Sequence, residues 1–154
     1  MSLRWNRNEL TKEQKKKLGL DDLEYSDEDK QSLSIKGRLG GLNKHIQKGK
    51  RNPHEYASWK KEQKNRVVAE IGIADIDPVP ACHLVIRYFE KSRRRDPDNI
   101  IGGGQKIIID ALVDAGILED DGWRCIWGVD SKVIKGADNP RVEVDIISRH
   151  KRQY

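Results

Sequence analysis

Arg93-Arg94-Arg95-Asp96-Pro97-Asp98-Asn99 is the stretch around which this chain of 154 residues is organised. Two carboxylates, Asp96 and Asp98, stand on either side of a proline. Proline favours extended backbone in the residue before it, and side chains two apart in an extended segment point to the same side. Such a pair of oxygen donors suits a hard divalent cation such as Mg²⁺. The same residues, taken alone, also fit a solvated turn.

The three arginines and a second acidic run extend this pattern. Arg93, Arg94 and Arg95 are suited to phosphate, because the planar guanidinium donates two parallel hydrogen bonds to phosphate oxygens. Glu119-Asp120-Asp121 follows further along the chain. Carboxylates placed beside cations indicate metal-assisted chemistry on a phosphodiester.

The order of these residues resembles the RusA family of Holliday-junction resolvases. The resemblance covers about residues 31–147 and is carried, in this order, by Arg94-Arg95-Asp96-Pro97-Asp98-Asn99, Lys106, Asp110-Ala111-Leu112, Ala115-Gly116 and Asp120-Asp121. It implies an endodeoxyribonuclease, dependent on Mg²⁺ or Mn²⁺, that acts as a homodimer. The implied substrate is the four-way (Holliday) DNA junction, which such enzymes resolve by paired nicks in recombination and repair.

The resemblance also implies roles for single residues. Asp96, Asp98 and Asp121 would hold the metal and carry catalysis, with Asp120 a weaker metal ligand, and Lys106 would stabilise charge on the phosphorus in the transition state. This chain has four residues more than the family pattern between Asn99 and Lys106, and they include a glycine run. The inserted residues could continue a helix. Three glycines disfavour a regular helix, however, so a flexible connector is an equal alternative.

Residues outside the motif are further candidates for DNA binding. By resemblance, Asn43 in the loop after the first strand lies near the active site, although an asparagine in a glycine loop also fits an Asx-turn. Lys60 and Lys64 lie on the polar face of an expected helix, where they would either contact a DNA backbone or be solvated. The resemblance and the arginines together predict that Arg93, Arg94 and Arg95 hold the scissile strand.

Periodicity predicts one α/β (α+β) domain in which a small mixed sheet is packed by two helices. Asn52 and Pro53 mark a clear helix start, and Val142, Val144 and Ile146 alternate with polar residues, as in a sheet with one buried face. The expected helices are residues 53–70 and 105–115, and the expected strands are residues 33–36, 81–89, 124–135 and 141–147, with the last two joined as a hairpin by residues 136–140.

Composition limits the remaining possibilities. We expect a polar N-terminal tail at residues 1–30, a RusA-like domain at 31–148 and a basic tail at 149–154. The formal net charge of +5 fits a polyanionic partner. No apolar run reaches the roughly 20 residues of a membrane span, so we expect no membrane partner and a cytoplasmic location. Cys82 and Cys125 lie in apolar stretches and are expected to be small buried hydrophobes.

Two other functions share these features. A nuclease of the same fold that acts on other branched DNA would use the same residues. A noncatalytic, basic DNA-binding protein would need only the cations, and the acidic residues argue against it because carboxylates repel phosphate unless a cation lies between them.

Overall fold

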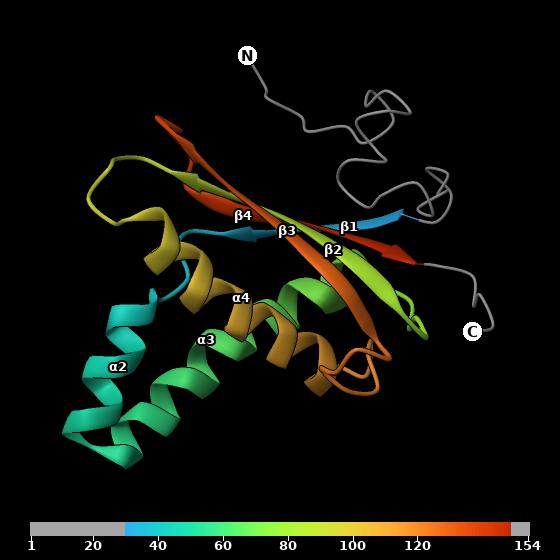
Figure 1. The fold of residues 1–154 in the computed structure, drawn as a ribbon, viewed down its shortest axis with the longest axis horizontal. Coiled ribbons are helices and arrows are strands. Elements are labelled where there is room, and N and C mark those ends of the chain that lie inside the picture. The colour runs from blue at the N-terminus through green and yellow to red at the C-terminus, as the bar shows by residue number, and fades with distance from the viewer. Residues whose placement is uncertain (1–29, 149–154) are drawn as a thin grey trace.

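A four-stranded mixed sheet carries three helices on one of its faces (Figure 1). This computed structural model describes residues 30–148. The predicted tails lie outside the described residues, except that Lys30 begins the first strand. The elements are β1 (Lys30–Lys36), α2 (Leu42–Arg51), α3 (Pro53–Ala74), β2 (Cys82–Glu90), α4 (Pro97–Asp114), β3 (Ile126–Lys135) and β4 (Arg141–Ser148). The α/β fold class is therefore confirmed, with α2 as a helix that we did not predict.

The strand order is β1-β4-β2-β3. β2 and β3 are parallel and are joined through α4 as a βαβ unit, whereas β4 is antiparallel to both β1 and β2. The predicted hairpin of the last two strands is wrong, because β4 lies on the other side of β2 from β3. Residues 136–140 cross the end of β2 instead, where the Ala137 N–H donates to the Glu90 carbonyl at 3.2 Å.

The core lies between the sheet and the helices. Val142, Val144 and Ile146 all face it and are buried, as their alternation predicted. Cys82 and Cys125 are buried free thiols, also as predicted, and burial raises the pKa of Cys82 to about 12. Among residues 30–148, no helix has the length and apolar character needed to cross a lipid bilayer.

Helix α3 begins where the sequence predicted and runs four residues beyond the predicted end. The Asn52 side chain accepts hydrogen bonds from the N–H groups of His54 and Glu55, at 3.0 and 3.4 Å. Pro53 occupies the first turn, where its missing N–H costs no hydrogen bond. Asp75, in the left-handed region with a φ of 53°, ends the helix.

Helix α4 runs without interruption through the glycine run, so the inserted residues are helical and do not form a connector. Gly103 and Gly104 are buried, and a Cβ on Gly104 would lie only 2.5 Å from Cε1 of Tyr88. The absence of a side chain at residue 104 therefore lets α4 approach β2 closely. The packing of the helix against the sheet offsets the low helix propensity of glycine.

We predict opposite effects for two Gly→Ala substitutions in helices. Gly104→Ala should lower the free energy of unfolding by about 1–2 kcal/mol, because the clash with Tyr88 outweighs the gain in helix propensity. Gly72→Ala, in α3, meets no atom within 4 Å and should raise that free energy by about 0.5–1 kcal/mol. Urea denaturation followed by circular dichroism measures both, and equal stabilisation by the two would contradict the close packing.

Candidate functional site

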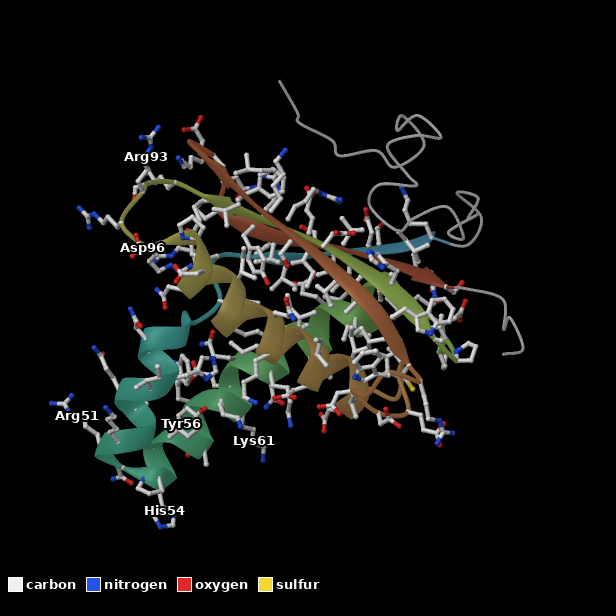
Figure 2. All side chains as sticks on the ribbon, in the orientation of Figure 1. Arg51, His54, Tyr56, Lys61, Arg93 and Asp96 are labelled. Carbon is white, nitrogen blue, oxygen red and sulfur yellow. The ribbon has the colours of Figure 1, made fainter. Side chains whose placement is uncertain are left out.

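The motif lies at the end of β2 and the beginning of α4 (Figure 2). Asp96 is the N-cap residue, with φ −70° and ψ 147°, and Pro97 is the first residue of the helix. The expected extended Asp-Pro-Asp segment is therefore wrong, because the fixed φ of proline favours the first helical position. Asp98 lies in the first helical turn, and both carboxylates are exposed. They share the positive end of the α4 dipole, which stabilises negative charge.

Arg95 is held inside the protein. Its guanidinium forms an ion pair with Glu90, which is 4% exposed, and donates to the Leu39 carbonyl at 2.7 Å. Glu90 also pairs with Arg38 at 3.5 Å. This arginine therefore fixes the loop between β2 and α4 against the turn after β1.

The two preceding arginines are placed differently. Arg93 and Arg94 are exposed, and Figure 2 shows Arg93 projecting from the loop that leads to Asp96. No ion pair engages either residue within the described part of the chain. Of the three arginines that the sequence predicted to bind DNA, these two present their guanidinium groups to solvent.

Asn43 is brought to the motif. Its N–H donates to the side-chain oxygen of Asn99 at 2.7 Å, although 56 positions separate the two residues. Gly41 permits this contact, since a Cβ there would lie 2.7 Å from Asn99 Nδ2. The predicted proximity of Asn43 to the motif is confirmed, whereas its contact with DNA is untested.

A cavity of about 460 Å³ opens beside this asparagine pair. Its described lining contains no carboxylate. The polar side chains that line it are Arg38, Asn43, Lys44, Gln47, Gln63, Arg95 and Asn99. The lining has three cations and no carboxylate, which favours an anionic group.

The second acidic run lies at the opposite end of α4. Helix α4 has 18 residues, which corresponds to about 27 Å at 1.5 Å per residue. Asp120 and Asp121 are exposed in the loop that follows it, where the Gly122 N–H donates to the Asp120 carboxylate at 2.7 Å. Within residues 30–148, no three Asp, Glu, His or Cys side chains are grouped so as to hold a metal ion. One chain therefore does not bring Asp96 and Asp98 together with Asp121.

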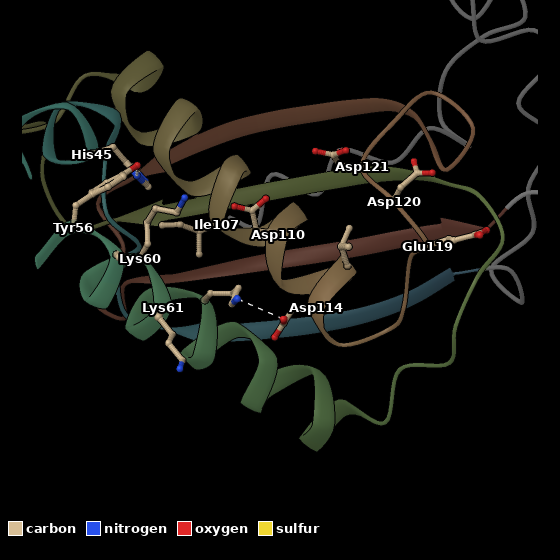
Figure 3. Close-up of a pocket in the computed structure, with 13 residues that line it drawn as sticks. His45, Tyr56, Lys60, Lys61, Ile107, Asp110, Asp114, Glu119, Asp120 and Asp121 are labelled. Carbon is tan, nitrogen blue, oxygen red and sulfur yellow. Dashed lines mark hydrogen bonds and ion pairs between the residues drawn. The ribbon is translucent and has the colours of Figure 1, made fainter. Parts of the chain in front are cut away.

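A larger cavity, of about 600 Å³, lies between α3 and α4 near that second run (Figure 3). Lys60 and Lys64 line it from α3, opposite Asp110 and Asp114 of α4, and Lys64 pairs with Asp114 at 3.4 Å. Asp121 lines the same cavity. Its walls thus combine both signs of charge, unlike the carboxylate-free cavity at the motif.

Lys106 is exposed on α4. It stands eight residues after Asp98, which is about 12 Å along a helix. The insertion thus places Lys106 more than two turns from the first acidic pair. The role of Lys106 at the phosphate stays a prediction.

Helix α2 contributes residues that the sequence analysis missed. His45 is buried, its Nδ1 lies 3.1 Å from the Tyr56 hydroxyl, and its ring packs edge-on against Trp59 at 4.7 Å between centroids. Burial is the main cause of the lowered pKa of His45. This helix was not predicted from the sequence because Gly49 has a low helix propensity and Leu42 and Ile46 are the only large apolar residues of this segment. A signal was present in Lys44, Lys48 and Arg51, which have the i, i+4, i+7 spacing of one helical face.

Comparison with known proteins adds no functional information. No protein-family model matches the chain, and a search of curated proteins finds no match. The function must therefore be argued from the residues and their geometry.

We predict that the Glu90 carboxylate is required for the stability of the motif loop. Glu90→Gln keeps the shape but leaves Arg95 without its buried counter-charge, so the free energy of unfolding should fall by about 3 kcal/mol. Glu62→Gln, at an exposed position of α3, is the matched control and should change it by less than about 0.5 kcal/mol. Urea denaturation at neutral pH measures both. Equal, small effects would mean that the pair contributes nothing to stability.

Proposed function

We propose that this protein is a Mg²⁺- or Mn²⁺-dependent endodeoxyribonuclease that cleaves branched DNA, with the four-way junction as its substrate. The observation that carries the proposal is the pair of exposed carboxylates, Asp96 and Asp98, at the start of α4 beside the exposed Arg93 and Arg94. Such a surface combines metal ligands with groups that donate hydrogen bonds to phosphate. The ordered resemblance to the RusA family supports the same chemistry and supplies the substrate.

The donor set fits a magnesium ion. Mg²⁺ at phosphoryl-transfer sites is held by one or two carboxylates together with substrate phosphates and water. Asp96 and Asp98 are carboxylates that form no ion pair with other described residues, so they are available as ligands. A bound divalent cation would supply Lewis-acid polarisation of the phosphate and a water of lowered pKa.

The protein's own groups would position the substrate. Arg93 and Arg94 would bind the phosphates of the scissile strand. The Asn43–Asn99 contact would fix the loop that borders the carboxylate-free cavity, which suits a neighbouring phosphate. Trp123, which is 94% exposed next to Gly122, offers a face on which an unpaired base at a branch point could stack.

The length of α4 favours a dimeric site. A two-fold axis across the middle of this helix would set the two copies antiparallel, so that Asp98 of one copy approaches Asp121 of the other. The edge strand β3, with its half-buried Val133, and the half-buried Ile109 of α4 offer a surface that a second copy could cover. Two sites about 27 Å apart, one helix length, would then serve two opposed nicks.

The proposed activity is tested with a labelled four-way junction. We expect nicks that require Mg²⁺ or Mn²⁺ and are absent with EDTA. Asp98→Asn should abolish cleavage and leave binding intact or tighter, because it removes one metal ligand and one negative charge near the phosphates. Metal-independent binding without any cleavage would instead support a noncatalytic DNA-binding protein. Competition with flap and three-way substrates separates a junction resolvase from a nuclease for other branched DNA.

Mixing two inactive variants tests the shared site. In a heterodimer of Asp98→Asn and Asp121→Asn, one site carries both changes and the other carries neither. Random mixing makes half of the dimers heterodimers, so nicking should recover to about one quarter of the wild-type level. Each variant alone is the control. No recovery after verified subunit exchange would place all ligands in one chain and refute the shared site.

A further inference from the structure

Residues 42–64 form a strongly basic unit, which we call the basic arm. It consists of α2 and the first half of α3. It contains seven Lys and Arg residues but only two carboxylates, Glu55 and Glu62. The difference equals the formal net charge of +5 of the whole chain, so the other residues are neutral in sum. The seven cations are Lys44, Lys48, Lys50, Arg51, Lys60, Lys61 and Lys64.

The charges of the basic arm have little compensation inside the protein. Among the described residues, the single ion pair formed by these seven cations joins Lys64 to Asp114. α2 contains no acidic residue at all. Lys44 and Lys48, spaced i,i+4, place their ammonium nitrogens 5.9 and 5.7 Å from the same Trp59 ring centroid. Like charges at this spacing destabilise a helix by a few tenths of a kcal/mol, so a polyanion from outside would relieve a repulsion built into the fold.

The basic arm is firmly attached. The ring of His45 packs between α2 and α3, 4.7 Å from Trp59 and 5.9 Å from Tyr56. The Trp59 ring in turn lies against Gly40, where a Cβ would come within 2.2 Å of it. The cations therefore lie on two helices that pack against each other, and Trp59 anchors this pair to the turn at Gly40, next to the motif.

The position of the basic arm relates it to the candidate site. α2 begins beside Asn99, through the bond from Asn43, and leads away from the sheet, and α3 then returns beneath the sheet (Figure 1). Arg51 and His54 lie at the far tip in Figure 2. The 10 residues of α2 extend over about 15 Å, which matches four to five phosphates of one DNA strand when they are counted along the duplex axis, at about 3.4 Å each.

We propose that the basic arm binds the phosphate backbone of one duplex arm of the branched substrate, leading away from the cleaved strand. This inference rests on the proposed function and adds to it a second contact, distinct from the carboxylate site. An anionic membrane surface fits the basic arm less well, because binding in the lipid interface requires a broad apolar face. Ile46, at 48% exposure, is the one exposed large apolar residue of this unit among the described side chains.

The test changes charge at the far part of α2, away from the motif. Lys48→Gln/Arg51→Gln removes two cations that share a helical face, and Lys30→Gln/Lys36→Gln removes two from β1 as the matched control. Binding to a four-way junction is measured in EDTA by fluorescence anisotropy over a range of salt concentrations. We expect the double variant in α2 to weaken binding about tenfold or more at 0.1 M salt and to flatten the plot of log K against log salt by about 1.8 units, or 0.9 per phosphate. The β1 control should keep the wild-type slope, and Lys48→Arg/Arg51→Lys should restore it.

Neutralising part of the DNA backbone shows where the basic arm contacts the DNA. Methylphosphonates at about five consecutive phosphates of one duplex arm, matching the length of α2, should weaken wild-type binding more than they weaken binding by the α2 variant, because two of the charge pairs are already lost in that variant. Cleavage by a saturating concentration of the α2 variant with Mg²⁺ should stay within about threefold of wild type, since the carboxylates are intact.

The outcomes separate the two proposals. If the α2 variant keeps the wild-type slope of log K against log salt and the protein cleaves with Mg²⁺, the DNA contact of the basic arm is refuted and the proposed nuclease activity is retained. Failure of the wild-type protein to bind any DNA at low salt would refute both proposals. Loss of binding to vesicles of anionic phosphatidylglycerol in the α2 variant, with unchanged DNA binding, would assign the cations to a membrane surface.

Discussion

The close contact between α4 and β2 at Gly104 and Tyr88 is the constraint on which the site depends. Because residue 104 has no side chain, a helix can lie directly on the sheet without a break from Pro97 to Asp114. A straight, packed helix holds its two ends apart by its full length. The two acidic runs of the sequence are therefore held at opposite ends of one rigid element, and the chemistry proposed for them follows from that separation.

Glu90 ties the motif to the same sheet. Its carboxylate is buried at the end of β2 and is shared by Arg95 and Arg38. Desolvating a carboxylate is costly, and two guanidinium partners offset that cost only while their geometry is kept. The crossing segment bonds to the main chain of the same residue through the Ala137 N–H. Three segments that are distant in sequence thus converge where β2 passes into the motif, which fixes where Asp96 begins its helix.

Sequence patterns predicted those parts of the fold that depend on local chemistry. The cap at Asn52 and the alternation of Val142, Val144 and Ile146 have local causes, and both predictions are confirmed. The pairing of the last two strands is a long-range property, since a five-residue connection can close a hairpin or cross the end of a neighbouring strand. Alternation does not distinguish these two cases, and the hairpin prediction was wrong.

The glycine insertion and the geometry of the candidate site also depend on contacts between distant residues, which local sequence patterns do not reveal. Intrinsic propensity disfavours a helix through Gly104, and packing of α4 against the sheet, which includes the close approach of Gly104 to Tyr88 from a distant strand, overrides that preference. The order of motif residues identified carboxylates and cations but not their distances, which depend on whether the insertion is helical. The contact between Asn43 and Asn99 was predictable in outline from resemblance, whereas the engagement of Arg95 by Glu90 required knowledge of where β1 and β2 end.

Electrostatics gives the two parts of the molecule different tasks. Carboxylates near both ends of α4 would repel a phosphate backbone, so the proposed DNA substrate would reach them only if other charges compensated for that repulsion. The basic arm carries a charge equal to the net charge of the chain. At its start, the Asn43 N–H donates a hydrogen bond to Asn99 of the motif. The cations of the basic arm lie on α2 and α3, whereas the proposed metal ligands lie at the start of α4 and in the loop that follows it. On the proposed function, affinity and chemistry could therefore be changed separately: a lost cation would weaken the encounter with DNA, whereas a lost carboxylate would stop the reaction after binding.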